Sequence, residues 1–277
     1  MTIKRMLVDK VDNQEPIAMV TAYDYPSAQM CESAHSDIIL VGDSLGMVVL
    51  GYSSTIKVTI EDMIHHGKAV KRGAPDTYTV VDMPFMSFNV SERDAIMNAK
   101  ELFQSIEPDA LKIEGGADVA PTVERITKAG IPIVGHVGLT PQNVNVLGGY
   151  RVQGRTEAEA KQLVEDAKAL EEAGAIAVVL ECVPARLAAK LTEELSIPTI
   201  GIGAGVECDG QVLVYHDLLE YGVSRLPKFV QSYANFNKDG TTAISHYVED
   251  VKNKFFPTEQ HTFQIKDEVL KGVYGGK

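Results

Sequence analysis

The sequence predicts a single α/β domain folded as a (β/α)8 barrel of the TIM type. Its 277 residues suit one barrel of this kind, and a hydrophobic content of 45% supplies a large core. Strand-like apolar runs alternate with helix-like segments from one end of the chain to the other. Several of these runs end in Asp, Glu or His, as expected where the carboxyl ends of barrel strands form an active site.

Eight apolar runs have the length and the β-branched content of strands. They cover residues 17–22, 38–41, 78–81, 110–113, 131–135, 175–180, 198–202 and 212–215. Helices are expected between them at 27–35, 59–72, 91–105, 119–129, 156–174 and 184–195. Thr59 and Asp62 form an imperfect capping box, Ser91 and Thr156 are caps, and Gly73 is expected to end its helix.

The seventh crossover is short, because only residues 206–211 separate the last two runs. An open doubly wound sheet is the second choice of architecture. It ranks lower because no early G-x-G-x-x-G motif opens a helix. We therefore expect residues 1–277 to form one barrel domain with an N-terminal extension and a C-terminal helical segment. The segment after Asp217 is more helical than stranded and is expected to pack on the outside of the barrel.

Charge and cysteine usage restrict the class of protein. A net charge of −12 argues against nucleic acid and anionic membranes as partners. The N-terminus lacks the apolar core of a signal peptide, and no apolar run is long enough to span a membrane. Cys31, Cys182 and Cys208 form no C-x-x-C pair, which indicates reduced thiols in a cytoplasmic protein.

The carboxyl ends of the predicted strands would bring acids together at one barrel mouth. The candidates are Asp24, Asp43 with Ser44, Asp82, Lys112 with Glu114, His136 and Glu181. Five carboxylates with little opposing charge repel one another, and a divalent cation relieves that repulsion. A site made of carboxylates, with no accompanying Cys and His ligands, favours a hard ion such as Mg2+.

Lys112 and Glu114 lie two residues apart on a strand, so they point to the same face. We expect that face to be the barrel interior, since the intervening Ile113 belongs against the helices. An interior lysine needs a carboxylate or an anionic ligand to remain charged.

Each candidate also has a purely structural interpretation. Asp24 is better explained as a helix cap, and Cys182 as inert packing. His136 is evenly balanced between a hydrogen-bonded core residue and a substrate ligand, and Glu181 could be the partner of a basic group. The glycines at 201, 203 and 205 resemble a phosphate-binding turn, but such turns are common.

Seven motifs in order resemble the ketopantoate hydroxymethyltransferase family, from about Thr2 to Phe263. They are TAYD (21–24), VGDSLGM (41–47), DMPF (82–85), KIEGG (112–116), GHVGLTPQ (135–142), LE (180–181) and GIGAG (201–205). The resemblance implies a barrel of the phosphoenolpyruvate/pyruvate superfamily type. It also implies Mg2+-dependent hydroxymethyl transfer from 5,10-methylenetetrahydrofolate to 3-methyl-2-oxobutanoate, in the pantothenate and coenzyme A pathway, by a homodecamer.

The same resemblance implies roles for the site residues. Asp43, Asp82 and Glu114 match the metal-binding acids of the family. Asp43, Ser44, Asp82 and Lys112 match its keto-acid contacts, and His136 sits in a matching motif on the substrate side. Glu181 matches the general base that would remove the C3 proton of the keto acid.

Two other functions stay open at this point. One is a Mg2+-dependent carbon–carbon lyase or mutase of the same barrel superfamily, although the catalytic cysteine loop of isocitrate lyases is missing here. The other is a non-catalytic binding barrel, which would keep Lys112 but would not need Glu181.

Overall fold

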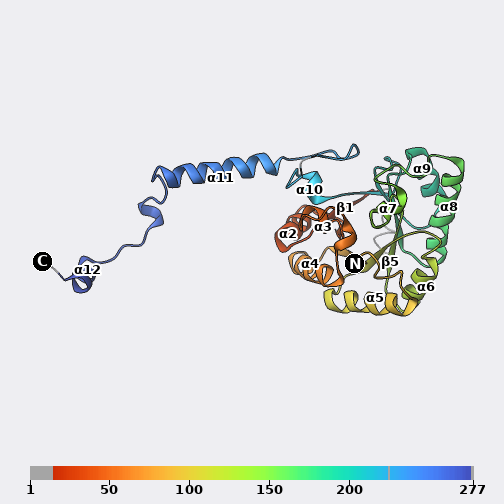
Figure 1. The fold of residues 1–277 in the computed structure, drawn as a ribbon, viewed down its shortest axis with the longest axis horizontal. Helices are drawn as coiled ribbons and strands as arrows, with labels where there is room; N and C mark the ends of the chain where they lie inside the picture. Colours follow the sequence, from red (N-terminus) through yellow and green to blue (C-terminus); the bar gives the residue numbers. More distant parts are fainter. Residues whose placement is uncertain (1–14, 224, 276–277) are drawn as a thin grey trace. The chain divides into compact units, whose positions relative to one another are not determined.

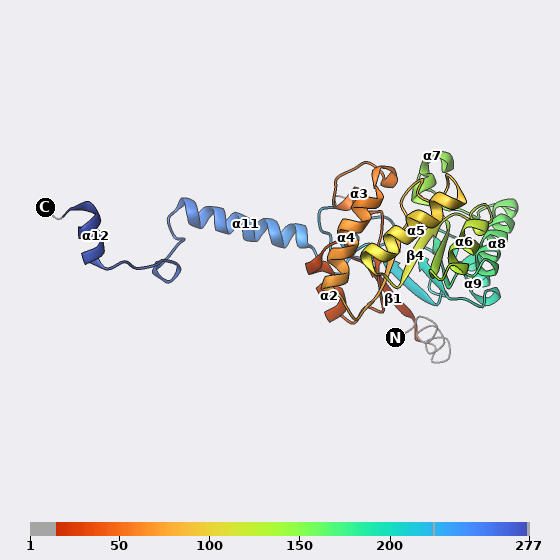
Figure 2. The same ribbon diagram turned by 90° about the horizontal axis from the view of Figure 1, so that it is seen from below.

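The computed structural model describes residues 15–223 and 225–275. Eight parallel strands pair in chain order and close into a barrel, which confirms the predicted fold (Figures 1 and 2). They are β1 (Ile17–Thr21), β2 (Ile38–Val41), β3 (Tyr78–Asp82), β4 (Ala110–Glu114), β5 (Ile133–Gly138), β6 (Ala177–Glu181), β7 (Thr199–Ile202) and β8 (Gly210–Leu213). The expected N-terminal extension lies outside the described residues.

The long helices surround the strands (Figure 1). They are α2 (Tyr25–Ser33), α4 (Ile60–Gly73), α5 (Glu92–Ile106), α6 (Ala120–Lys128), α8 (Glu157–Glu172) and α9 (Ala185–Glu194). Within the described chain no helix lies between β7 and β8, as the short crossover indicated. Three single-turn helices were not predicted: α3 (Leu45–Val48), α7 (Val144–Leu147) and α10 (Tyr215–Leu218).

Residues from Ala234 onward form a second compact unit. It contains α11 (Phe236–Lys252), a 3-10 turn at Glu259–His261 and α12 (Asp267–Tyr274). The helical character predicted for this segment is confirmed. That it belongs to one domain with the barrel and packs on the barrel's outside stays a prediction.

Of the eight strands, β2 alone has its predicted bounds; the others differ by one to three residues at one or both ends, and β5 and β8 differ most. β5 starts at Ile133 and runs to Gly138, so His136 lies inside the strand, opposite Glu114 of β4. Pro132 was wrongly included in that strand because an apolar run does not show where ladder pairing begins. β8 starts at Gly210, two residues before its predicted first residue, because glycine gives no strand signal although it pairs there with β1 and β7.

The barrel core has two layers that explain the position of the site. One cluster fills the interior and includes Val80, Ala110, Val134 and Val179. Each of these residues is followed two positions later by a polar side chain on the same face. Those polar residues are Asp82, Lys112, His136 and Glu181. Ile113 belongs instead to the outer cluster beneath the helices, as predicted.

Gly73 ends its helix as predicted, one residue beyond the expected last helical residue. It is the last residue of α4, and Ala74 is the cap. A Cβ atom at Gly73 would collide with the carbonyl oxygen of Tyr25 and would lie 2.9 Å from Cβ of Ala28, both on α2. The glycine is therefore required by close packing of two helices rather than by a turn.

Gly73→Ala is expected to lower the free energy of unfolding by about 1–3 kcal/mol, because a backbone atom cannot yield to the added methyl group. Gly240→Ala in α11 is the matched control, since nothing lies within 4 Å of a Cβ atom there. The control should leave stability unchanged or slightly raise it. Urea unfolding measures both variants, and equal stabilities would contradict the packing argument.

Candidate active site

All seven residues predicted for metal, substrate and base line one cavity at the carboxyl ends of the strands. Its volume is about 840 Å3. The predicted residues in it are Asp43, Ser44, Asp82, Lys112, Glu114, His136 and Glu181. Asp24 lies elsewhere and caps α2 by accepting a hydrogen bond from the Ser27 amide at 2.8 Å, as its structural interpretation predicted.

Lys112 is the buried cation of the site. Its Nζ lies 3.0 Å from Asp82 Oδ1 and 3.6 Å from Glu114 Oε1. Burial alone would lower the pKa of Lys112, but attraction to Asp82, Glu114 and Asp43 outweighs it and raises the pKa above its ordinary value. The ammonium group therefore remains charged inside the barrel.

Asp43 shows that the site holds more negative charge than Lys112 can balance. Its backbone N–H donates to Asp82 Oδ2 at 3.0 Å, so the two carboxyl groups are neighbours. Burial and repulsion from Asp82 and Glu114 raise the pKa of Asp43 well above its usual range. Burial also raises the pKa of Asp82, against the attraction of Lys112. An added cation would relieve this repulsion.

The pKa of Glu114 is shifted in the opposite direction from those of Asp43 and Asp82. Burial opposes its ionisation, yet Lys112 and the hydrogen bond with His136 together hold the pKa of Glu114 below its usual value. The site therefore contains one stable carboxylate, Glu114, and a pair of acids, Asp43 and Asp82, that are held at high energy when ionised.

His136 connects the acids of β4 and β6. Its Nδ1 lies 3.3 Å from Glu114 Oε1 and 3.1 Å from Lys112 Nζ, and its Nε2 lies 3.3 Å from Glu181 Oε2. Burial and the charge of Lys112 lower the pKa of His136, but the contacts with Glu114 and Glu181 prevail and raise it to about 9. His136 is buried and has polar contacts on both ring nitrogens, yet it also lines the cavity, so a core residue and a substrate ligand both stay open as interpretations.

Gln142 was missed by the sequence interpretation although it holds the acids in place. Its Nε2 donates to Asp43 Oδ2 at 2.8 Å and to the Met83 carbonyl at 2.9 Å. Its backbone N–H donates to Glu114 Oε2 at 3.0 Å. A neutral amide gives no charge signal in a sequence, so only its place at the end of the 135–142 motif could have indicated it.

Ser44 and Tyr23 form another pair in this region. The Tyr23 hydroxyl lies 2.8 Å from Ser44 Oγ. A Cβ atom at Gly42 would lie 2.9 Å from Ser44 Oγ, so the glycine gives that hydroxyl its space. Tyr23 therefore orients Ser44 beside the acids, a role that sequence alone did not indicate.

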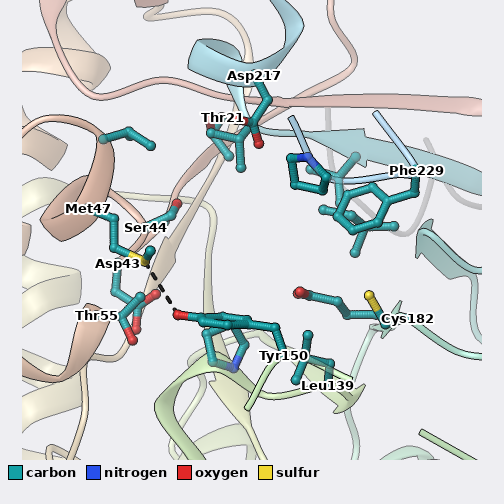
Figure 3. A pocket seen from close by; sticks show the side chains of 18 of the residues that line it. Thr21, Asp43, Ser44, Met47, Thr55, Leu139, Tyr150, Cys182, Asp217 and Phe229 are labelled. Atoms are coloured by element: carbon teal, nitrogen blue, oxygen red, sulfur yellow. Dashed lines mark hydrogen bonds between the residues drawn. The ribbon is translucent and has the colours of Figure 1, made fainter. Parts of the chain in front are cut away.

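Figure 3 shows the cavity from close by. Tyr150 extends across it toward Met47, with its hydroxyl 3.5 Å from the Met47 sulfur, while Asp217 and Phe229 lie on the opposite side. Cys182 lies on the wall, and burial raises the pKa of its thiol to about 11, which agrees with its predicted inertness.

The glycines of the GIGAG turn have packing reasons of their own. A Cβ atom at Gly203 would meet the Phe229 ring at 2.9 Å, and one at Gly205 would meet Cβ of Ala185 at 2.6 Å. Both glycines also have positive φ angles, of 65° and 96°. Close contact and backbone conformation thus explain them without a bound phosphate.

The donor atoms in the cavity suit a hard divalent cation. In the part of the chain that the structure describes, no group of three His, Cys, Asp or Glu side chains is already arranged around a metal position. The chemistry nevertheless fits: Asp43, Asp82 and Glu114 offer only oxygen donors, and Asp82 Oδ1 receives no hydrogen bond of good geometry. These three carboxylates could hold Mg2+, which keeps further oxygen ligands from water or substrate.

Gln142→Leu is expected to lower kcat by about 10–100-fold, the usual cost of losing a group that orients metal-binding carboxylates. It removes the amide donor to Asp43 and Met83 but keeps the backbone bond to Glu114. Gln211→Leu is the control, because that amide bonds the Gly205 carbonyl at 2.8 Å and does not line the cavity. Steady-state assays compare them, and equal kcat values would exclude the orienting role.

Comparison with known proteins agrees with the site. A family model described as ketopantoate hydroxymethyltransferase matches residues 1–259. A 3-methyl-2-oxobutanoate hydroxymethyltransferase from Bacillus cereus (strain G9842) is 59% identical over 263 residues, which cover 95% of each chain. One from Bacillus thuringiensis (strain Al Hakam) is also 59% identical over 263 residues, 95% of this chain and 94% of that relative.

Solved structures of low sequence identity share the fold. A phosphonopyruvate hydrolase aligns with a TM-score of 0.62 at 11% identity, over 99% of this chain and 96% of that one. A 2,3-dimethylmalate lyase, a PEP mutase/isocitrate lyase superfamily member, gives 0.56 at 13% identity, over 99% and 92%. These proteins therefore share the barrel fold of this chain.

Proposed function

Because the chain belongs to the ketopantoate hydroxymethyltransferase family, we propose that its barrel mouth adds a hydroxymethyl group to 3-methyl-2-oxobutanoate, with 5,10-methylenetetrahydrofolate as the one-carbon donor and Mg2+ as the metal. The enzyme class and the keto acid follow from the family and the named relatives. The products are ketopantoate and tetrahydrofolate, at an early step of pantothenate synthesis.

One observation supports this function above the others: an oxygen-only acid cluster and a separate carboxylate face the same cavity. Asp43, Asp82 and Glu114 come from three neighbouring strand ends, whereas Glu181 ends β6. A 2-oxo acid needs both, because its ketone must be polarised while a base removes the adjacent proton.

The metal would be held by Asp43, Asp82 and Glu114, whose repulsion it would relieve. When bound, Mg2+ would polarise the ketone and make the C3 proton of the keto acid more acidic. Lys112 and Ser44 would donate to the substrate carboxylate or to the developing enolate oxygen. Their positions are fixed beforehand, Lys112 by Asp82 and Ser44 by Tyr23.

Glu181 would take the C3 proton. Its Oε2 faces His136 Nε2 at 3.3 Å, and its side chain keeps 14% exposure, so it can reach substrate and solvent. The C3 carbon of the enolised keto acid would then form a bond to the methylene carbon of the folate, which would lie toward the cavity opening. The bonds from that carbon to the folate nitrogens would break, and water would supply the hydroxyl oxygen, so that keto acid, 5,10-methylenetetrahydrofolate and water give ketopantoate and tetrahydrofolate. His136 would orient the carboxylate and stabilise its charge.

The lyase or mutase alternative has no specific observation in its favour, since the low-identity structures show the fold alone. The described residues include no helix long and apolar enough to cross a membrane. A cytoplasmic location is proposed on the cysteine usage, and a homodecameric assembly on the family resemblance.

The function is tested by following tetrahydrofolate formation from 5,10-methylenetetrahydrofolate. We expect formation to require both 3-methyl-2-oxobutanoate and Mg2+. Tetrahydrofolate formed at the same rate without the keto acid would contradict the proposed reaction.

Lys112→Met is expected to lower kcat/KM. The expected decrease corresponds to a loss of about 2–4 kcal/mol of transition-state stabilisation, the scale of one preorganised donor. Methionine keeps most of the buried stem, and Mg2+ binding should not weaken because a competing positive charge is lost. Lys71→Met is the control, since its 3.0 Å ion pair with Asp109 lies outside the cavity. An unchanged kcat/KM in Lys112→Met would make Lys112 a structural partner only.

A further inference from the structure

The cavity is much larger than the proposed metal ion and keto acid would fill. A volume of about 840 Å3 lies in the upper part of the range that holds drug-sized ligands. The residues proposed for metal and keto acid lie at the strand ends, and a five-carbon acid would occupy only that region. The outer part of the cavity has room for a second, larger ligand.

Part of the cavity wall is apolar and partly aromatic. Met47, Tyr150, Val152, Leu226 and Phe229 line it. Figure 3 places Tyr150 and Phe229 on different sides of the opening. Such a wall suits a flat heteroaromatic group, which can pack against rings and a thioether.

Three cations line the same cavity: Arg151, Arg225 and Lys228, defined here as the basic rim. All three are exposed, and none has an acidic group within 4.0 Å among the residues that the structure describes. Lys112 is different, because it is buried and paired with Asp82. In a chain of net charge −12, the basic rim is a local site for an anion.

We propose that the basic rim binds the carboxylates of the γ-linked glutamate tail of the folate, while the apolar wall holds its ring system. This inference rests on the proposed function, because it assumes a folate as the second substrate. The keto acid already has Lys112 and Ser44 inside the barrel, so its single carboxylate does not need the rim. A glutamate tail extends away from the reacting ring toward solvent, and each added glutamate brings another carboxylate within reach of arginine and lysine.

The test compares KM for 5,10-methylenetetrahydrofolate with one and with four glutamates. In the unchanged protein the tetraglutamate should have the lower KM, by about 5–10-fold for two or three exposed ion pairs. Added salt should reduce this difference, because exposed charges are screened. Arg225→Ala/Lys228→Ala should bring the ratio of the two KM values close to one.

Arg72→Ala/Lys100→Ala is the matched control. It removes one arginine and one lysine that are exposed on α4 and α5 and do not line the cavity. The control should keep the ratio of the unchanged protein. A ratio near one in the unchanged protein, or a ratio that survives Arg225→Ala/Lys228→Ala, would overturn the tail site.

The two hypotheses fail in different ways. If the unchanged protein turns over both folates but does not distinguish them, only the tail site is wrong. If neither folate supports turnover while the keto acid still exchanges its C3 hydrogen, folate is not the donor. The proposed binding site for the glutamate tail is then wrong as well.

Discussion

Asp43→Ala is expected to abolish turnover and to remove the stabilisation that Mg2+ gives the folded protein. Asp43 is buried beside Asp82 and Glu114, and their repulsion raises its pKa well above the usual range. Removing this charge relieves repulsion in the metal-free protein, so the fold should remain intact. It also removes one of three carboxylates from a site where a hard cation depends on oxygen ligands.

Thermal unfolding with and without Mg2+ measures this effect separately from activity. A ligand at 100 times its Kd stabilises the native state by about 2.7 kcal/mol, and the variant should lose that increment. Asp217→Asn is the control, because Asp217 lines the same cavity on another side of it (Figure 3). The metal assignment is wrong if Asp43→Ala keeps both normal turnover at low Mg2+ and the full Mg2+-induced shift.

Glu181→Gln is expected to lower kcat by about 100-fold or more, the usual scale for a general base. Glutamine keeps the shape of the side chain and can still contact His136, but it cannot take a proton. Since Glu181 is separate from the three proposed metal ligands, binding of Mg2+ and keto acid should persist. Calorimetric titration of the variant measures this binding.

Cys182→Ala is the control for local disturbance, because Cys182 follows Glu181 and lines the same wall. Its thiol is held protonated by burial and takes no part in the proposed reaction. It should retain most of the activity. Normal kcat in Glu181→Gln would exclude Glu181 as the base and make His136 the next residue to test.

The barrel could be predicted because its strands are uniform apolar runs and its helices have clear caps. The active-site end of the barrel could be predicted because Asp82, Lys112 and Glu114 lie in or at the ends of apolar runs, where a buried strand would otherwise carry no charged side chain. Period-two alternation placed Lys112 and Glu114 inside, and the outer position of Ile113 confirms it.

The parts that could not be predicted depend on contacts between distant segments. Gln142 is 99 residues from Asp43, and nothing in either local sequence links the two. The need for a glycine at position 73 arises from the approach of α4 to α2, which the local helix-stop signal did not show. Single-turn helices such as α3 and α7 have too few residues for a periodic pattern.

The most direct test is hydrogen exchange at C3 of 3-methyl-2-oxobutanoate in D2O without any folate, followed by NMR. Removal of that proton needs only the keto acid, the metal and the base. We predict exchange by the unchanged protein with Mg2+, little without Mg2+, and a loss of about 100-fold or more in Glu181→Gln. Exchange that requires folate, or that proceeds at the unchanged rate in Glu181→Gln, would contradict the proposal that this barrel mouth enolises the keto acid through Glu181.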